Sequence, residues 1–163
     1  MNILILGIGQ SLRGDDAAGL EAVRLWQELC PETAQRVRLE FAELPGLGLL
    51  DLLKGMDAAV LVDAVHAMSA AGTILHLSQD DLASFAPGSG SAHGWGVAET
   101  LALGRLLSPS LAECRITLIG IVGEKFDMGT GLSQGVREVL PAACSLLDQE
   151  IRSFLRERNA SSC

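Results

Sequence analysis

Residues 2–19 read NILILGIGQSLRGDDAAG, and this stretch decides the fold. The apolar run Ile3–Leu6 leads into Gly7 and Gly9, and a helical pattern begins at about Asp16. A short aliphatic run that passes through glycines into an amphipathic segment is typical of the start of a βαβ unit. The first strand should therefore lie in a mostly parallel sheet.

The rest of the chain repeats this alternation of short apolar runs and helical patterns, which predicts an α/β fold. The predicted strands are Asn2–Leu6 or Gly7, Arg36–Glu43, Ala58–Val62, Thr73–Leu77 and Arg115–Val122. The predicted helices are Asp16–Cys30, Pro45–Lys54, Val97–Leu107 and Ser133–Arg156. Residues 87–96 are rich in glycine and serine and are predicted to form a loop.

Length and composition limit the function classes. The 163 residues predict one domain, 1–156, with a loose tail at 157–163. A net charge of −8 with scattered basic residues argues against nucleic acid as a partner. The sequence contains no run of about 20 apolar residues, so no membrane span is predicted. Four cysteines without a Cys-x-x-Cys pair or a secretory signal predict free thiols in the cytoplasm.

The glycines after the first strand invite a dinucleotide-binding interpretation, but the pattern is incomplete. The third glycine of that fingerprint should stand at position 12, which is Leu12. The next glycine is followed by Asp15 and Asp16, whose charges would repel a pyrophosphate at a helix N-terminus. A nucleotide-binding regulator is therefore a weak alternative. One carboxylate is enough for a helix cap, so Asp15 could cap the helix while Asp16 points elsewhere.

Three side chains are candidates for a metal site. Asp16 opens a helix, Asp63 closes the strand 58–62, and His93 lies in the small-residue loop. The carboxyl ends of parallel strands meet at one edge of a sheet, so these side chains could converge there. Two neighbouring carboxylates repel each other and are stabilised by a proton or a cation, and two oxygens with one nitrogen suit nickel, zinc or manganese. The alternatives are that Asp63 caps a turn, that His93 is only exposed to solvent, and that His66 is a rival ligand.

The segment 7–19 resembles the opening motif of the nickel–iron hydrogenase maturation endopeptidases. Val62-Asp63-Ala64 is similar to the second motif of that family, Ser91-Ala92-His93 with Gly96 to the third, and residues 118–124 to its late strand and loop. The similarity extends from about residue 2 to residue 155. The chain departs from the family in having Gln10 in place of the usual asparagine. It also lacks the usual glycine pair after the second strand, where residues 43–46 read ELPG.

The resemblance implies a three-layer α/β/α sandwich with a twisted, mostly parallel sheet of five or six strands. It also implies that Asp16, Asp63 and His93 contact the metal. In this family the metal is nickel already inserted in the precursor of the hydrogenase large subunit, from which the enzyme removes a C-terminal extension. The free protein is then expected to be a monomer that binds nickel weakly or not at all, and no residue is assigned as the catalytic base. The alternative is a non-catalytic metallochaperone or docking module for the same precursor.

Overall fold

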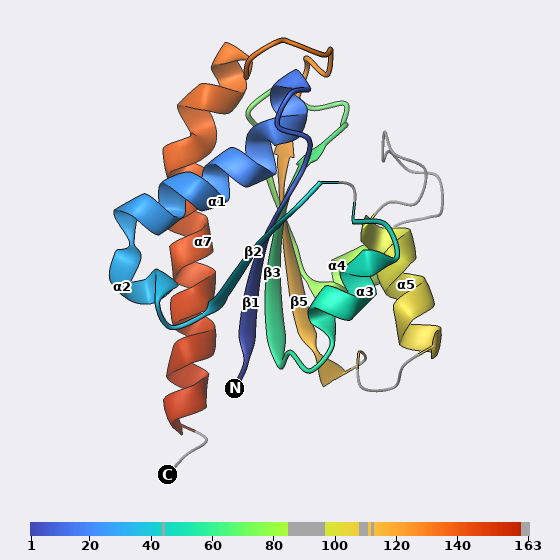
Figure 1. The fold of residues 1–163 in the computed structure, drawn as a ribbon, viewed down its shortest axis with the longest axis vertical. Helices are drawn as coiled ribbons and strands as arrows, with labels where there is room; N and C mark the ends of the chain where they lie inside the picture. The colour runs from blue at the N-terminus through green and yellow to red at the C-terminus, as the bar shows by residue number, and fades with distance from the viewer. Residues whose placement is uncertain (44, 85–96, 108–110, 112, 161–163) are drawn as a thin grey trace.

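The computed structural model describes residues 1–43, 45–84, 97–107, 111 and 113–160. Helices and strands alternate along the chain, as expected for an α/β protein (Figure 1). The elements are β1 (Ile3–Ile8), η1 (Gly14–Ala17), α1 (Ala18–Leu29), α2 (Pro31–Ala34), β2 (Arg38–Ala42), α3 (Gly48–Leu53), β3 (Ala58–Val65), β4 (Ile74–Leu77), α4 (Gln79–Ser84), α5 (Val97–Leu107), β5 (Arg115–Val122) and α7 (Gln134–Ala160).

The strands of the described residues form one five-stranded sheet in the order β2-β1-β3-β5-β4. The pairs β1–β2, β1–β3 and β3–β5 are parallel, whereas β4 is antiparallel to β5. Helices α1 and α7 cover one face of the sheet, and α3, α4 and α5 cover the other (Figure 1). The predicted three-layer, mostly parallel fold with five or six strands is confirmed.

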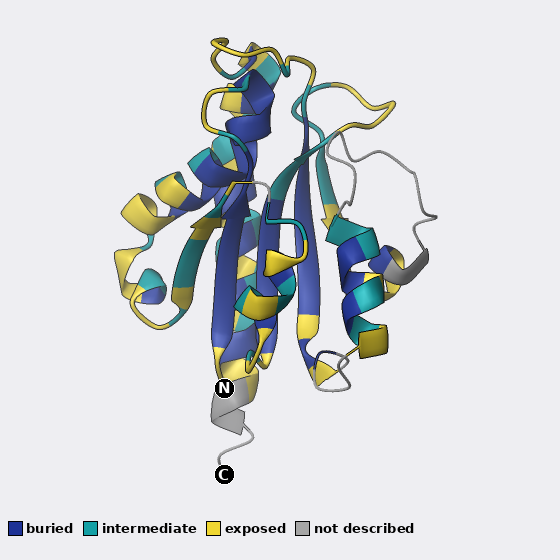
Figure 2. Cartoon of the chain, turned by 45° about the vertical axis from the view of Figure 1, so that its right-hand side comes forward, coloured by how far each residue is buried: buried dark blue, intermediate teal, exposed yellow. Residues whose placement is uncertain are grey.

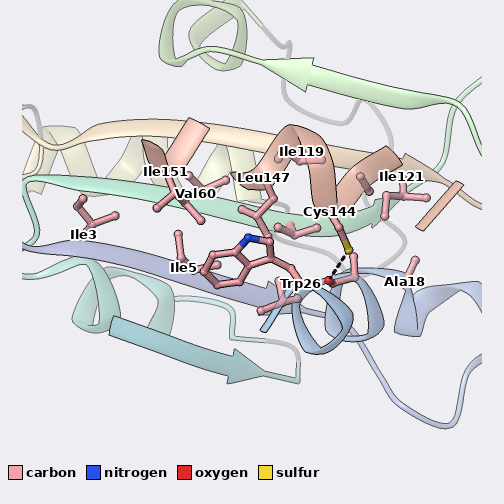
Figure 3. Close-up of a cluster of buried hydrophobic side chains, with 14 of the residues drawn as sticks. Ile3, Ile5, Ala18, Trp26, Val60, Ile119, Ile121, Cys144, Leu147 and Ile151 are labelled. Atoms are coloured by element: carbon pink, nitrogen blue, oxygen red, sulfur yellow. Dashed lines mark hydrogen bonds between the residues drawn. The ribbon is translucent and has the colours of Figure 1, made fainter. Parts of the chain in front are cut away.

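Alternate residues of the central strands point into two separate cores. In β1, Ile3 and Ile5 belong to the core beneath α1 and α7, and Leu4 and Leu6 to the core beneath α3, α4 and α5. Because both faces are covered, β1, β3 and β5 are buried along most of their length (Figure 2). In the first core, Trp26 is fully buried between α1 and α7 and packs near Ile5 and Leu147 (Figure 3).

Besides shifts of one to three residues at several other ends, the elements differ from the predicted ones in four places. The predicted helix 16–30 is divided into the short 3-10 turn η1 and the helix α1, and Pro31 begins the next helix. Strand β3 continues to Val65, so Asp63 lies within the strand and does not close it. Helix α7 extends to Ala160, past the predicted end at Arg156. Helix α4 has no counterpart in the prediction, because its six residues are too short to show a periodic pattern.

Two further expectations concern the whole chain. Cys30, Cys114 and Cys144 are free thiols, and the fourth cysteine, Cys163, lies outside the described residues. Within the part of the chain that the structure describes, no helix is both long enough and apolar enough to cross a membrane.

Candidate metal-contacting site

Asp16 and Asp63 lie where the order of the strands reverses. The chain leaves β1 through α1 to reach β2 on one side, and β3 then pairs with β1 on its other side. Such a reversal leaves a crevice outside the carboxyl ends of the two strands, where ligands of open α/β sheets bind. Asp16 follows β1 and Asp63 lies near the carboxyl end of β3, so both acids lie at this edge of the sheet.

Glycines allow the segment after β1 to fold tightly against the sheet. Gly9 has φ +148°, and a Cβ atom there would lie 1.9 Å from the carbonyl oxygen of Asp16. A Cβ atom on Gly19 would lie 2.2 Å from the carbonyl oxygen of Val62 and 2.4 Å from that of Ile8. These distances are too short for any side chain, so the glycines let η1 and the start of α1 sit directly on the ends of β1 and β3.

Asp16 is held at this edge by the turn that precedes it. The residue is buried, with 4% exposed, and its Oδ2 accepts a hydrogen bond from the backbone N–H of Gln10 at 3.1 Å. The backbone N–H of Arg13 in turn donates to the carbonyl oxygen of Gln10 at 3.2 Å. Position 10 therefore serves the turn through its backbone, which explains how glutamine can replace the asparagine that is usual in the family motif.

Asp63 is half-buried and faces the helical layer made of α3, α4 and α5. Its neighbours Val62 and Ala64 pack into the opposite core, and side chains alternate along a strand. Burial, and secondarily the nearby charge of Asp16, raise the pKa of Asp63 from 3.8 to about 7. A hydrogen bond from the backbone of Ala64 acts in the opposite direction.

The two carboxylates therefore form a coupled acidic pair at the edge of the sheet. At neutral pH, the pair is stabilised either by a proton on Asp63 or by a cation between the two groups. Perturbed pKa values of this kind are typical of functional sites. The prediction that Asp16 and Asp63 come together agrees with this coupling. The third predicted ligand, His93, lies outside the described residues, and among those described no three His, Cys, Asp or Glu side chains form a metal-binding group.

The other candidates do not join this pair in a metal-binding group of described residues. The exposed ring of His66 stacks on the ring of Phe126 with the centroids 3.9 Å apart. The Nε2 atom of His76 lies 3.1 Å from Oε1 of Glu150 on α7. The suggestion that Asp15 caps the helix is wrong, because neither η1 nor α1 has a side-chain cap.

Asp15 instead binds a segment that is distant in sequence. The residue is fully buried, and its Oδ2 accepts hydrogen bonds from the backbone N–H groups of Glu124 at 2.8 Å and Lys125 at 3.0 Å. Its Oδ1 accepts one from the backbone N–H of Ser133 at 2.6 Å. These bonds outweigh the effect of burial and keep the pKa of Asp15 below its ordinary value. The sequence could not reveal this role, because all three partners follow β5 while Asp15 follows β1.

Comparisons with known proteins show which family the chain is similar to. The family model described as hydrogenase maturation protease matches residues 44–150. A hydrogenase expression/formation protein, HupD, of Rhodobacter capsulatus is 31% identical over 97% of this chain and 71% of its own length. The hydrogenase 2 maturation protease of Escherichia coli strain K12 is 26% identical over 96% of this chain and 92% of its own.

A solved structure is similar to this chain in fold and in sequence. It is the [NiFe] hydrogenase maturation protease HybD from Thermococcus kodakarensis, which superposes with a TM-score of 0.74 and 27% sequence identity. The match covers 93% of this chain and 99% of that one. The chain therefore belongs to the hydrogenase maturation protease family.

Proposed function

We propose that this protein removes the C-terminal extension from the precursor of a nickel–iron hydrogenase large subunit. We further propose that nickel already bound in the precursor docks on Asp16, Asp63 and His93. The observation that carries the proposal is the coupled pair of Asp16 and Asp63 at the strand-order reversal, in a chain of this protease family. Nickel is then part of the substrate, and the free protein binds it weakly because it offers an incomplete ligand set.

The placement of Asp63 supports the proposal that His93 is the third nickel ligand. Asp63 faces the layer that contains α5, whose first residue is Val97. Helix α5 runs from the carboxyl edge of the sheet toward its amino edge (Figure 1). His93 precedes this helix by four positions in the chain. Two carboxylate oxygens and one imidazole nitrogen make a donor set that suits nickel.

A divalent ion held at this edge would polarise the scissile carbonyl group or lower the pKa of a bound water molecule. The protein's own contribution is to place the two carboxylates at the carboxyl edge of the sheet. We propose that the enzyme acts as a monomer in the cytoplasm and that its only macromolecular partner in this reaction is the precursor.

The test is cleavage of purified large-subunit precursors, each prepared with and without nickel. The intact mass of the precursor is followed by mass spectrometry after incubation with the wild-type protein or with Asp16→Asn, Asp63→Asn or His93→Ala. Asp127→Asn serves as a control, because its exposed side chain lies on a neighbouring loop. We expect the wild type and the control to shorten only the nickel-loaded precursor, and the three site variants to lose the activity.

Three outcomes would contradict the proposal. A precursor that binds the protein without any change in mass would identify a metallochaperone or docking module. Normal cleavage by the three site variants would show that these residues do not contact the nickel. Tight, stoichiometric nickel in the free protein, measured by isothermal titration calorimetry, would instead indicate a resident metal.

A further inference from the structure

The two consecutive aspartates after β1 have different surroundings. Asp16 is near enough to Asp63 for its charge to affect the ionisation of that residue, whereas Asp15 is fully buried, with 0% exposed, and turned toward residues 124–133. A side chain without accessible surface cannot touch a substrate. The three N–H groups that Asp15 accepts are all backbone donors, so its role is to hold the main chain of this distant segment in place.

The contact between the two segments extends beyond Asp15. The backbone N–H of Gly129 donates to the carbonyl oxygen of Leu12 at 2.8 Å, and that of Gly14 donates to the carbonyl oxygen of Thr130 at 3.1 Å. The Nε of Arg13 donates to the carbonyl oxygen of Phe126 at 3.3 Å. Residues 12–15 are thus bonded one after another to residues 124–133, and Asp16 is the next residue in the chain.

The same distant segment is attached to the strand that carries Asp63. The backbone N–H of Gly123 donates to the carbonyl oxygen of Val65 at 3.1 Å, two residues after Asp63. The stacked rings of Phe126 and His66 form a second attachment. Residues 123–133 therefore connect the segment that carries Asp16 with the strand that carries Asp63.

From this geometry we infer that Asp15 is a positioning residue for the cleavage reaction. By binding the N–H groups of Glu124, Lys125 and Ser133, it fixes the segment 12–16 against residues 123–133 and so sets the position of Asp16 relative to Asp63. This inference rests on the proposed function, because it assumes that Asp16 and Asp63 contact the nickel of the precursor. The two consecutive aspartates then have different roles. Asp16 contacts the nickel of the substrate, and Asp15 holds the backbone that positions Asp16.

Graded substitutions separate positioning from direct chemistry. A carboxylate accepts all three N–H groups, the side-chain oxygen of Asp15→Asn accepts at most two, and Asp15→Ala accepts none. A positioning role predicts that kcat for the nickel-loaded precursor decreases in the order wild type, Asn, Ala, reaching a loss of about 100-fold, as expected when reacting groups are misplaced by about 1 Å. We expect KM and the pH profile of kcat/KM to remain unchanged.

A second variant disturbs Asp15 without changing any charge. A Cβ atom on Gly123 would lie 2.7 Å from Cβ of Asp15 and 2.7 Å from the ring of Phe126. Gly123→Ala should therefore displace Asp15 and lower kcat in the same way. Gly131→Ala is the matched control in the same segment, because its methyl group would meet no heavy atom of the described residues within 4 Å. This control should keep full activity.

Hydrogen exchange provides the structural measurement. We expect faster exchange of the amides of Glu124, Lys125 and Ser133 in the Asp15 variants and in Gly123→Ala, with the core strands still protected. Equal activity losses in Asp15→Asn and Asp15→Ala together with an altered pH profile would overturn the inference, because they indicate direct chemistry.

Full activity in Asp15→Ala would overturn the inference too, provided that the wild type cleaves the precursor. If Asp15→Ala does not fold, Gly123→Ala decides the question by the same measurements. A wild-type protein that fails to cleave would instead contradict the proposed function.

Discussion

Replacement of Asp63 by asparagine is expected to stabilise the protein, and to do so more strongly at alkaline than at acidic pH. The folded state raises the pKa of this carboxyl group from 3.8 to about 7, so it holds the proton more tightly than the unfolded chain does. The stability of the wild type therefore falls as the pH rises from about 3.8 to about 7, and this contribution is constant above that range. Asparagine does not ionise and lacks this dependence.

The magnitude follows from the change in pKa. Ionising a group whose pKa is raised from 3.8 to about 7 costs the folded state about 4 kcal/mol at pH well above 7. Between pH 5 and pH 8, the difference in unfolding free energy between Asp63→Asn and the wild type should grow by about 2–3 kcal/mol. The lowered pKa of Asp15 acts in the opposite direction, but its effect is lost only as the pH falls toward and below the ordinary pKa of 3.8, outside this window.

Urea unfolding of the nickel-free proteins at pH 5 and pH 8 measures this difference. Asp127→Asn is the control, because it removes one exposed carboxylate and should change the unfolding free energy by the same small amount at both pH values. A difference between Asp63→Asn and the wild type that does not change with pH would refute the reasoning. It would mean that Asp63 ionises as freely in the folded protein as in water, without burial or repulsion from Asp16.

Three other predictions concern packing and thiol chemistry. Gly19→Ala should destabilise the protein by at least about 2 kcal/mol in urea unfolding, because its methyl group would meet two strand carbonyls, whereas Gly48→Ala should lie within about 0.5 kcal/mol of the wild type. Trp26→Phe should cost about 1–3 kcal/mol in the same assay, because it removes the 3.3 Å bond from the indole N–H to a carboxylate on α7, and an unchanged midpoint would contradict this. Burial raises the pKa of Cys114 and Cys144 to about 11, so at pH 8 both should be alkylated at least about 100-fold more slowly in the folded protein than in urea, as followed by peptide mass spectrometry. Equal rates would show that these thiols are accessible.

The fold class was predictable because strand and helix signals are local. The apolar run of β5 and the helical pattern of α5 predicted the observed boundaries, Arg115–Val122 and Val97–Leu107. Burial on both faces makes a central strand apolar throughout, and this composition can be read from a few neighbouring residues. The expectation that Asp16 and Asp63 lie at the same edge of the sheet also needed only the rule that parallel strands end at one edge.

Other features depend on which segments pack together. The antiparallel direction of β4 depends on its pairing with β5, about 40 residues further along the chain. The pKa of Asp63 depends on burial and on the approach of Asp16, neither of which is visible in the residues next to it. The three hydrogen bonds of Asp15 join segments that only tertiary packing brings together.

Periodicity and composition identify which residues face the core and which sheet edge carries the acids. The hydrogen bonds of Asp15 and the pKa of Asp63 depend on the non-local donors and charges that surround them in the folded chain. The reason is that hydrogen bonds and desolvation act between groups that are close in space, regardless of their separation in sequence.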